Sequence, residues 1–328
     1  MSVAFQLVGF AISIALFLWV IRQATSEENA ESLERLRNAA VGPVLGLLAL
    51  TAASVLLNGL IFWVTVRPLR KLDPVGVVGV NAIATFLSIL PFKIGFLSRA
   101  LIHRSRDGMP IIDLASWFIS VSLLGMSVFV PLGVISLWRG ELDGVWWAAS
   151  GASIVFACVA AVVLGRLSQK HAWLAKLSLG SWRIVMHPSA VISSTTFRLM
   201  DVAALGGRFL VAASIIGQPI SFAEAGKHGT AFYLISVLSP AGVLGFRETA
   251  SERLGMVSDA AEQFALIALL VTFAEILVAG GLALAAAAYL RVDKLLLGQR
   301  TKKPLPEEGA SPAEPDREEP ISPDERSS

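Results

Sequence analysis

Six stretches of the sequence are each long and apolar enough to cross a lipid bilayer as a helix. They run from Val3 to Ile21, Ala39 to Val66, Ile111 to Trp138, Val145 to Leu164, Ala190 to Ile216 and Ala260 to Tyr289. A hydrocarbon core about 30 Å thick requires about 20 such residues. Of the 328 residues, 55% are hydrophobic and only 16% are charged, whereas soluble domains average about 25% charged residues. The sequence therefore predicts an all-α polytopic integral membrane protein and excludes an ordinary soluble enzyme.

Two further apolar stretches are shorter and are broken by proline. Val75 to Leu90 ends at Pro91, and Thr230 to Phe246 is interrupted at Pro240. Proline removes a backbone donor, and broken backbone at membrane depth is tolerated only inside protein or beside a watery cavity. These segments either cross the membrane, giving eight spans, or dip in and return, leaving six full spans.

The distribution of Lys and Arg favours the second arrangement. Eight crossings place equal numbers of loop Lys and Arg on the two sides, when Lys93, Arg198 and Arg208 are set aside as intramembrane charges. If the two broken segments are re-entrant, the side of the termini instead carries more than twice as many loop Lys and Arg residues as the other side. We expect the protein to lie in the inner membrane of a bacterial cell. Because cytoplasmic loops are rich in Lys and Arg, we expect both of its termini to lie in the cytoplasm.

The remaining segments are short. The first apolar stretch exceeds the length of a signal-peptide core and follows no basic residue, so we expect a retained anchor. Residues 165–188 mix basic and large apolar side chains, which is typical of a helix at headgroup level. We expect residues 1–295 to form the helical bundle. Residues 296–328 are rich in Pro and Glu and predict a disordered cytoplasmic tail.

Three charges lie within the stretch from Ala190 to Ile216. Arg198, Asp201 and Arg208 share one helical face, at about 100° per residue, and a charge at mid-membrane costs about 2.5–3.5 kcal/mol. Either arginine could reach the headgroups with its long side chain. Asp201 is too short to do so and needs a partner, for which Arg198 is the obvious choice. The sequence predicts one acid between two arginines, and hence an anion-accepting face or a structural triad.

The first broken segment carries a second group of cations. Lys93 follows Pro91 by two residues, where freed backbone amides and an ammonium would converge. Arg99, His103 and Arg106 follow on one helical face. We predict an anion site here, with a positive loop that only fixes orientation as the alternative.

The second broken segment is rich in small residues and ends in an acid. Pro240, Gly242 and Gly245 allow close backbone approach. Glu248 follows them, where it could act at the site or simply complement a helix dipole. Glu275 lies alone in the last apolar stretch and should face the interior of the bundle.

Familiar enzyme constellations do not occur in the sequence. It contains no P-loop, nucleophile elbow or HExxH motif. The single cysteine, Cys158, excludes an internal disulfide and a Cys-based zinc cluster, and the four histidines have no metal-like spacing. We therefore expect no catalytic residues, no cofactor and no metal, and a protein that is not an enzyme.

The two broken segments resemble a known family, the flippase-like transmembrane domain of lysylphosphatidylglycerol synthases. The first family motif, Pro-x-(Lys/Arg)-x-Gly-Glu-x-x-Arg, matches residues 91–99, including Gly95, except that Phe96 replaces the glutamate. The second, a Pro- and Gly-rich turn closing in glutamate, matches residues 239–248. The resemblance covers most of residues 39–289. It implies a bundle in which two proline-broken elements enclose a cavity for an amphipathic lipid, without the family's lysine-transferring domain.

These observations lead to one hypothesis and its rivals. The hypothesis is a flippase-like protein that binds an anionic lipid or lipid-linked headgroup, with no nucleic-acid partner. Phosphate or carboxylate would contact Lys93, Arg99, Arg198 and Arg208. Asp201 would orient an arginine, and Glu248 would provide a counter-charge. The main rival is a non-transporting scaffold or accessory protein of envelope lipid or polysaccharide synthesis; a membrane-embedded lipid enzyme is a weaker third.

Overall fold

The structure of the chain is a computed structural model that describes residues 3–89, 94–139, 141–238, 245–249 and 261–292. Within these ranges every regular element is a helix and no strand occurs. Four candidate site residues of the sequence analysis, Pro91, Lys93, Pro240 and Gly242, lie outside the described residues, as does the predicted tail.

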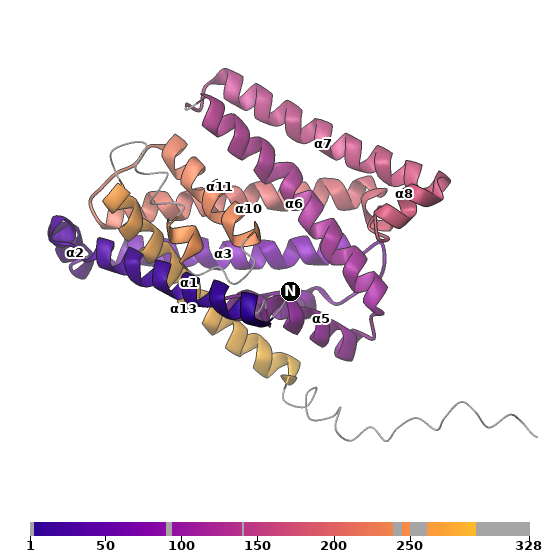
Figure 1. Ribbon diagram of the computed structural model, residues 1–328, viewed down its shortest axis with the longest axis horizontal. Helices are drawn as coiled ribbons and strands as arrows, with labels where there is room; N and C mark the ends of the chain where they lie inside the picture. The colour runs from indigo at the N-terminus through magenta and orange to yellow at the C-terminus, as the bar shows by residue number, and fades with distance from the viewer. Residues whose placement is uncertain (1–2, 90–93, 140, 239–244, 250–260, 293–328) are drawn as a thin grey trace, which may run out of the picture.

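Six long helices form an elongated bundle (Figure 1). They are α1 (Val3–Ala24), α3 (Val41–Val66), α6 (Ile111–Arg139), α7 (Gly144–Lys170), α10 (Pro188–Ile215) and α13 (Ala261–Leu290). At 1.5 Å per residue, even the 22 residues of α1 extend about 33 Å, enough to cross a bilayer. Among the described residues, α3, α6, α7 and the part of α13 from Phe264 also have the apolar content of spanning helices. The predicted all-α polytopic membrane fold is confirmed.

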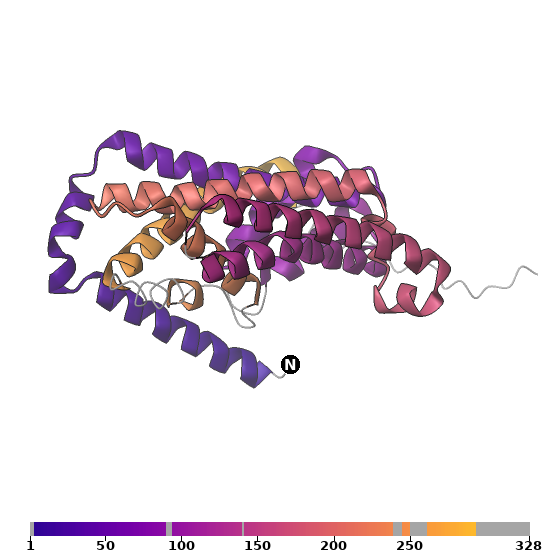
Figure 2. The ribbon, with the colours of Figure 1, turned by 90° about the horizontal axis from the view of Figure 1, so that it is seen from above.

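Short helices mark the two ends of the bundle (Figures 1 and 2). The 3₁₀ helix η1 (Glu27–Asn29) and α2 (Ala30–Arg37) join α1 to α3 at what we call the α2 end. At the opposite end, the α8 end, α8 (Ala172–Leu177) and α9 (Trp182–Val185) join α7 to α10. Trp173 and Leu177 on α8 are exposed, which suits the headgroup-level segment predicted for residues 165–188.

Helices α3 and α10 pack against each other in opposite directions. Near their middles, Ser54 Oγ donates a hydrogen bond to Asp201 Oδ1 at 2.5 Å. Towards the α8 end, Arg67 just after α3 and His187 just before α10 line one pocket. The chain therefore leaves α3 at the α8 end and leaves α10 at the α2 end.

The first broken segment forms a hairpin that enters and leaves at the α8 end. It consists of α4 (Pro74–Leu87) and α5 (Ile94–Asp107), which pack against each other. Each has 14 residues, or about 21 Å, which is too short to cross the hydrocarbon core. Arg106 at the end of α5 contacts Asp73 at the start of α4 at 3.4 Å, and Arg70 donates to the carbonyl of Asp107. The two outer ends of the hairpin therefore lie together.

The second broken segment folds back from the α2 end. Helix α11 (Phe222–Leu238) follows α10, and residues 245–249 return beside it, because the Arg247 guanidinium lies 4.4 Å from the centre of the Phe232 ring. His228 on α11 stacks on Phe264 near the start of α13, with ring centres 3.5 Å apart. Helix α13 thus begins at the end where α11 begins.

The described path therefore combines six long helices with two shorter segments that fold back from opposite ends of the bundle. This arrangement matches the re-entrant alternative of the sequence analysis. Helix α1 runs towards the α2 end and α13 runs away from it, so α1 begins and α13 ends on the same side (Figure 1). That side is the one to which the re-entrant arrangement assigns most of the Lys and Arg residues.

Candidate functional site

A cavity of 260 Å³ lies where the two hairpins meet the long helices. Its walls come from the middle of α3, α10 and α13 and from α4, α5, α11 and the segment 245–249. Its polar lining comprises Ser54, Asn58, Thr85, Ser88, Arg99, Asp201, Tyr233, Arg208, Arg247 and Glu275. A charged cavity therefore sits halfway along the membrane-crossing helices, where isolated charges are costly.

Arg198 and Asp201 form an ion pair on the cavity side of α10. Arg198 Nη1 donates to Asp201 Oδ2 at 2.9 Å, and both side chains are almost completely buried. The Arg198 guanidinium also lies 5.1 Å from the centre of the Tyr233 ring, which is stacked on Phe129. The pairing predicted from their spacing is present, and burial of Arg198 excludes the alternative in which it reaches the headgroups.

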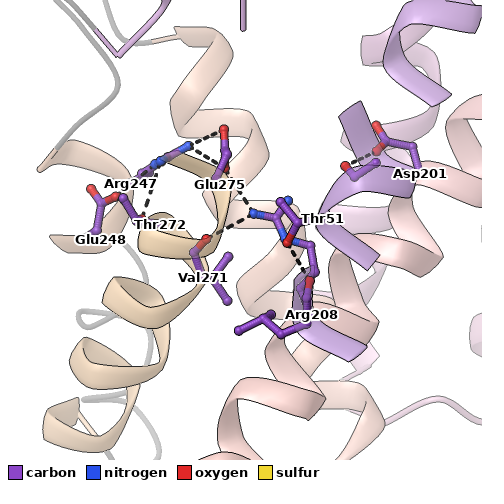
Figure 3. Close-up of polar contacts among 10 residues, drawn as sticks. Thr51, Asp201, Arg208, Arg247, Glu248, Val271, Thr272 and Glu275 are labelled. Atoms are coloured by element: carbon purple, nitrogen blue, oxygen red, sulfur yellow. Dashed lines mark hydrogen bonds and ion pairs between the residues drawn. The ribbon is translucent and has the colours of Figure 1, made fainter. Parts of the chain in front are cut away.

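Arg208 has a different partner from the one expected. Its Nη2 donates to Glu275 Oε2 at 3.1 Å and to the carbonyl of Val271 at 3.3 Å, both on α13 (Figure 3). Asp201 lies about two turns away on α10 and is occupied by Arg198 and Ser54. The prediction of one acid between two arginines is therefore wrong, because a carboxylate from another helix is nearer. Glu275 faces the interior, as expected.

Glu275 is shared with a second arginine that belongs to the returning hairpin. Arg247 Nη1 donates to both carboxylate oxygens of Glu275, at 3.2 and 3.1 Å, and its Nε donates to Glu248 Oε1 at 2.9 Å (Figure 3). Glu248 is fully buried and accepts further bonds from Thr272 Oγ1 at 2.5 Å and from the Gly245 amide at 2.6 Å. The segment 245–249 is thus tied to α13, and Glu248 does more than complement a helix dipole.

Arg99 is the cavity arginine that no described carboxylate neutralises. It projects from α5, donates from Nη2 to Asn81 Oδ1 at 2.7 Å and lies 4.0 Å from the centre of the Phe62 ring. Its Nε is buried without a hydrogen-bond partner. Asn81 is held in turn by a 3.4 Å bond to the Val55 carbonyl. A guanidinium that no described carboxylate neutralises therefore borders the cavity.

The charges around the cavity do not cancel. Among the described residues, three arginines (Arg99, Arg208 and Arg247) and two carboxylates (Asp201 and Glu275) line the cavity. With their direct partners Arg198 and Glu248 included, the group has four arginines and three carboxylates. The surplus positive charge predicted from the sequence is present when all seven groups are ionised. It is located at Arg99, because the other three arginines each contact a carboxylate.

The other two members of the predicted α5 face do not reach the cavity. His103 is buried and bonds Asp107 through Nδ1 at 2.6 Å, and Arg106 contacts Asp73. Both pairs close the base of the α4–α5 hairpin at the α8 end. They belong to the hairpin's structure, so the cation cluster predicted for this segment contributes only Arg99 to the cavity among its described members.

Two motif glycines allow close packing of the hairpins. A Cβ at Gly95 would run into the Ala84 carbonyl and the Ser88 side chain of α4. Gly245 has a φ of +86° and lies against the backbone of α1 at Ser13, where a Cβ has no room. Glycine is therefore required at both positions by the fold, which accounts for their place in the two motifs.

Several cavity residues were not singled out in the sequence. Arg247 follows the end of the second broken apolar stretch at Phe246, so the sequence alone suggests a charged residue in a loop. Tyr233 and Asn81 are single polar residues within apolar runs. Ser54 and Asn58 offered the clearest signal, because they lie four residues apart, on one face of the otherwise apolar α3.

The sequence of this chain matches the family model described as the lysylphosphatidylglycerol synthase TM region over residues 6–283. The chain belongs to this family. Membership of the lysylphosphatidylglycerol synthase TM region family makes it a multi-pass membrane protein related to lipid handling. Neither the curated proteins nor the solved structures include a significant match to the chain.

Proposed function

We propose that this protein binds an anionic lipid or lipid-linked headgroup in the central cavity and moves it between the leaflets. The observation that carries the proposal is Arg99, a cation that lines a 260 Å³ cavity and has no carboxylate partner among the described residues. An unpaired charge at this depth is costly. A visiting phosphate or carboxylate would neutralise it through charge-assisted hydrogen bonds.

The other charged groups have supporting roles in this proposal. Arg208 lines the cavity and is oriented by Glu275, while Arg198 would contact the headgroup from behind Asp201, which fixes its orientation. Glu248 is the counter-charge that holds Arg247. Lys93, which lies outside the described residues, would add a further cation near the tip of the first hairpin. Asp201 is the group that would carry a coupling proton.

The proposal includes an orientation for the protein. Among the described residues outside the cavity, more Lys and Arg lie on the side where α1 begins and α13 ends, which is the α8 end, than on the opposite side. Cytoplasmic loops of membrane proteins carry an excess of these residues. We therefore assign the α8 end to the cytoplasm of a bacterial inner membrane, with the first hairpin entering from the cytoplasmic side.

Transport can be tested with the purified protein in vesicles that contain fluorescently labelled phosphatidylglycerol. Wild type should move the label between leaflets, and Arg99→Gln should slow this movement by about tenfold or more, because one charge-assisted contact contributes roughly 1.5–3 kcal/mol. Arg166→Gln, which removes an exposed arginine on α7 far from the cavity, is the matched control. Equal rates for wild type and Arg99→Gln would overturn the assignment of Arg99.

A scaffold function has one observation in its favour. The Arg208–Glu275–Arg247–Glu248 network ties α10, α13 and the segment 245–249 together, as a purely structural charge cluster would. An Arg198→Asp/Asp201→Arg double swap distinguishes the two functions. Preserved stability with lost lipid movement supports transport, whereas preserved stability and preserved cellular function support the scaffold.

A further inference from the structure

A second polar pocket, of 390 Å³, lies at the α8 end between the end of α3 and the start of α10. Its polar lining is Arg67, Lys71, His187, Ser189 and Ser193. Arg67 in this pocket follows Asn58 of the central cavity by nine residues along α3, a separation of about 14 Å. The two hollows are therefore separate sites, one at mid-membrane and one near the headgroups.

The cations of this pocket are not neutralised by the protein. No Asp or Glu lines it. Within the described part of the chain, Arg67 and Lys71 take part in no ion pair, whereas nearby Arg106 contacts Asp73. A pocket with two such cations attracts an anion, and this attraction is stronger near the low-dielectric bilayer than in open water.

The pocket is also shaped by the backbone around it. Helix α10 begins there, with Pro188 in its first turn, and its N-cap residue His187 makes no side-chain capping bond. Amides of the first helical turn and the positive end of the helix dipole favour an anion. Beside the pocket, the Trp63 indole donates to the Leu72 carbonyl at 3.2 Å, and the guanidinium of the lining residue Arg67 lies 5.1 Å from the centre of the Trp63 ring. These contacts hold the loop of residues 67–72, which contains Arg67 and Lys71, beside the pocket.

An apolar track leads from the pocket towards the middle of the membrane. Ile192 on α10, one turn from the pocket residue Ser189, is 62% exposed. Further along, Leu199 on α10 and Leu56 on α3 are also exposed. Because α3 and α10 are antiparallel, Leu56 and Leu199 stand at the same depth. A polar pocket next to exposed aliphatic side chains matches the polar headgroup and the acyl chains of a phospholipid.

We propose that this pocket binds the phosphate of an anionic phospholipid from the leaflet at the α8 end, with its acyl chains along Leu56, Ile192 and Leu199. Basic pockets between membrane helices bind anionic lipid headgroups in this manner. Trp63 lies near the end of α3, one turn before Arg67, and tryptophan is enriched at membrane–water interfaces. The bound lipid stays in its leaflet, in contrast to the lipid proposed for the central cavity.

Native mass spectrometry of the purified protein tests the proposal, with phosphatidylglycerol or phosphatidylcholine added to the detergent. The variant is R67Q/K71Q. The matched control is K170Q/K176Q, which removes two exposed cations at the same end but outside the pocket. Both variants also carry R99Q, so that lipid bound at Arg99 in the central cavity does not contribute to the measured lipid binding.

In the R99Q background, we expect the control to retain phosphatidylglycerol and R67Q/K71Q to lose it by about tenfold or more, since each basic residue near an anionic lipid contributes about 1 kcal/mol. Excess inorganic phosphate should leave the bound lipid in place. Equal retention by R67Q/K71Q, equal loss in the control, equal retention of phosphatidylcholine, or displacement by inorganic phosphate would each overturn the proposal.

Discussion

The two hairpins start from opposite ends of the bundle, and each brings one arginine to the central cavity in a different electrostatic setting. Arg247 of the second hairpin is enclosed by Glu248 and Glu275. Arg99 of the first hairpin has an amide oxygen and an aromatic ring as its partners. The first arrangement satisfies the cation within the protein, while the second leaves capacity for an external anion. The comparison separates a structural charge from one that is available to a ligand.

The largest expected effect follows from removing the acid that two arginines share. Glu275→Ala leaves Arg208 without a carboxylate and Arg247 with only Glu248. Breaking a buried ion pair typically costs about 3–5 kcal/mol. We expect a large drop in the thermal unfolding temperature in detergent, measured by the fluorescence of a thiol-reactive dye at Cys158. An unfolding temperature equal to that of wild type would show that the second hairpin is not held by its charges.

The matching change in the first hairpin should affect binding more than stability. Arg99→Gln removes a cation that has no described carboxylate to leave unpaired. We expect anionic-lipid binding to weaken by about tenfold or more, with a much smaller change in unfolding temperature than for Glu275→Ala. Arg99→Lys, which keeps the charge, should retain part of the binding. If Arg99→Gln unfolds the protein as strongly as Glu275→Ala does, the two arginines are both structural.

An acid placed beside Arg99 should make the first hairpin resemble the second. Phe96 occupies the position of the motif glutamate, three residues before Arg99, and is 48% exposed beside Phe118. In Phe96→Glu the new carboxylate is within reach of Arg99 at i+3 and should lower anionic-lipid affinity severalfold. Phe96→Gln is the uncharged control. Loss of affinity in the control alone would contradict the electrostatic explanation.

The smallest effect is expected for an ion pair outside the membrane, where water competes with it. Asp143 caps α7 through the Trp146 amide and pairs with Arg139, and these contacts, above all the one with Arg139, hold the pKa of Asp143 below its usual value. Because the pKa of Asp143 is lower in the folded state, its ionised carboxylate stabilises the fold at pH values above the unfolded pKa of about 3.9. This stabilisation is lost as the pH falls through the pKa of the folded state.

Asp143→Asn should therefore lower the unfolding temperature slightly at pH 7 and have no effect well below pH 3.9. Thermal unfolding of both proteins at the two pH values measures this difference. A gap between the two proteins that persists at the lower pH would show that ionisation of Asp143 is not its source.

The helices were predictable from sequence because each long apolar run has few structural alternatives in a membrane. The prolines and the Lys and Arg distribution also indicated the two hairpins, since a broken, short segment cannot satisfy its backbone in lipid. Partners within one helix, such as Arg198 and Asp201, follow from periodicity alone.

Partners on different helices could not be predicted in this way. The pairing of Arg208 with Glu275 depends on how α10 packs on α13, which residue spacing does not encode. Arg247 reads as a loop residue because its burial requires the hairpin to fold back onto Phe232 and α13. The surplus charge was predictable in sign, but its location at Arg99 emerged only from the pairing of the other three arginines.

The most direct test of the central claim is a structure of the protein in nanodiscs made of phosphatidylglycerol. The account predicts density for a lipid headgroup in the central cavity, within hydrogen-bonding distance of the Arg99 guanidinium. A cavity without a headgroup, with Arg99 neutralised by another protein carboxylate, would contradict it.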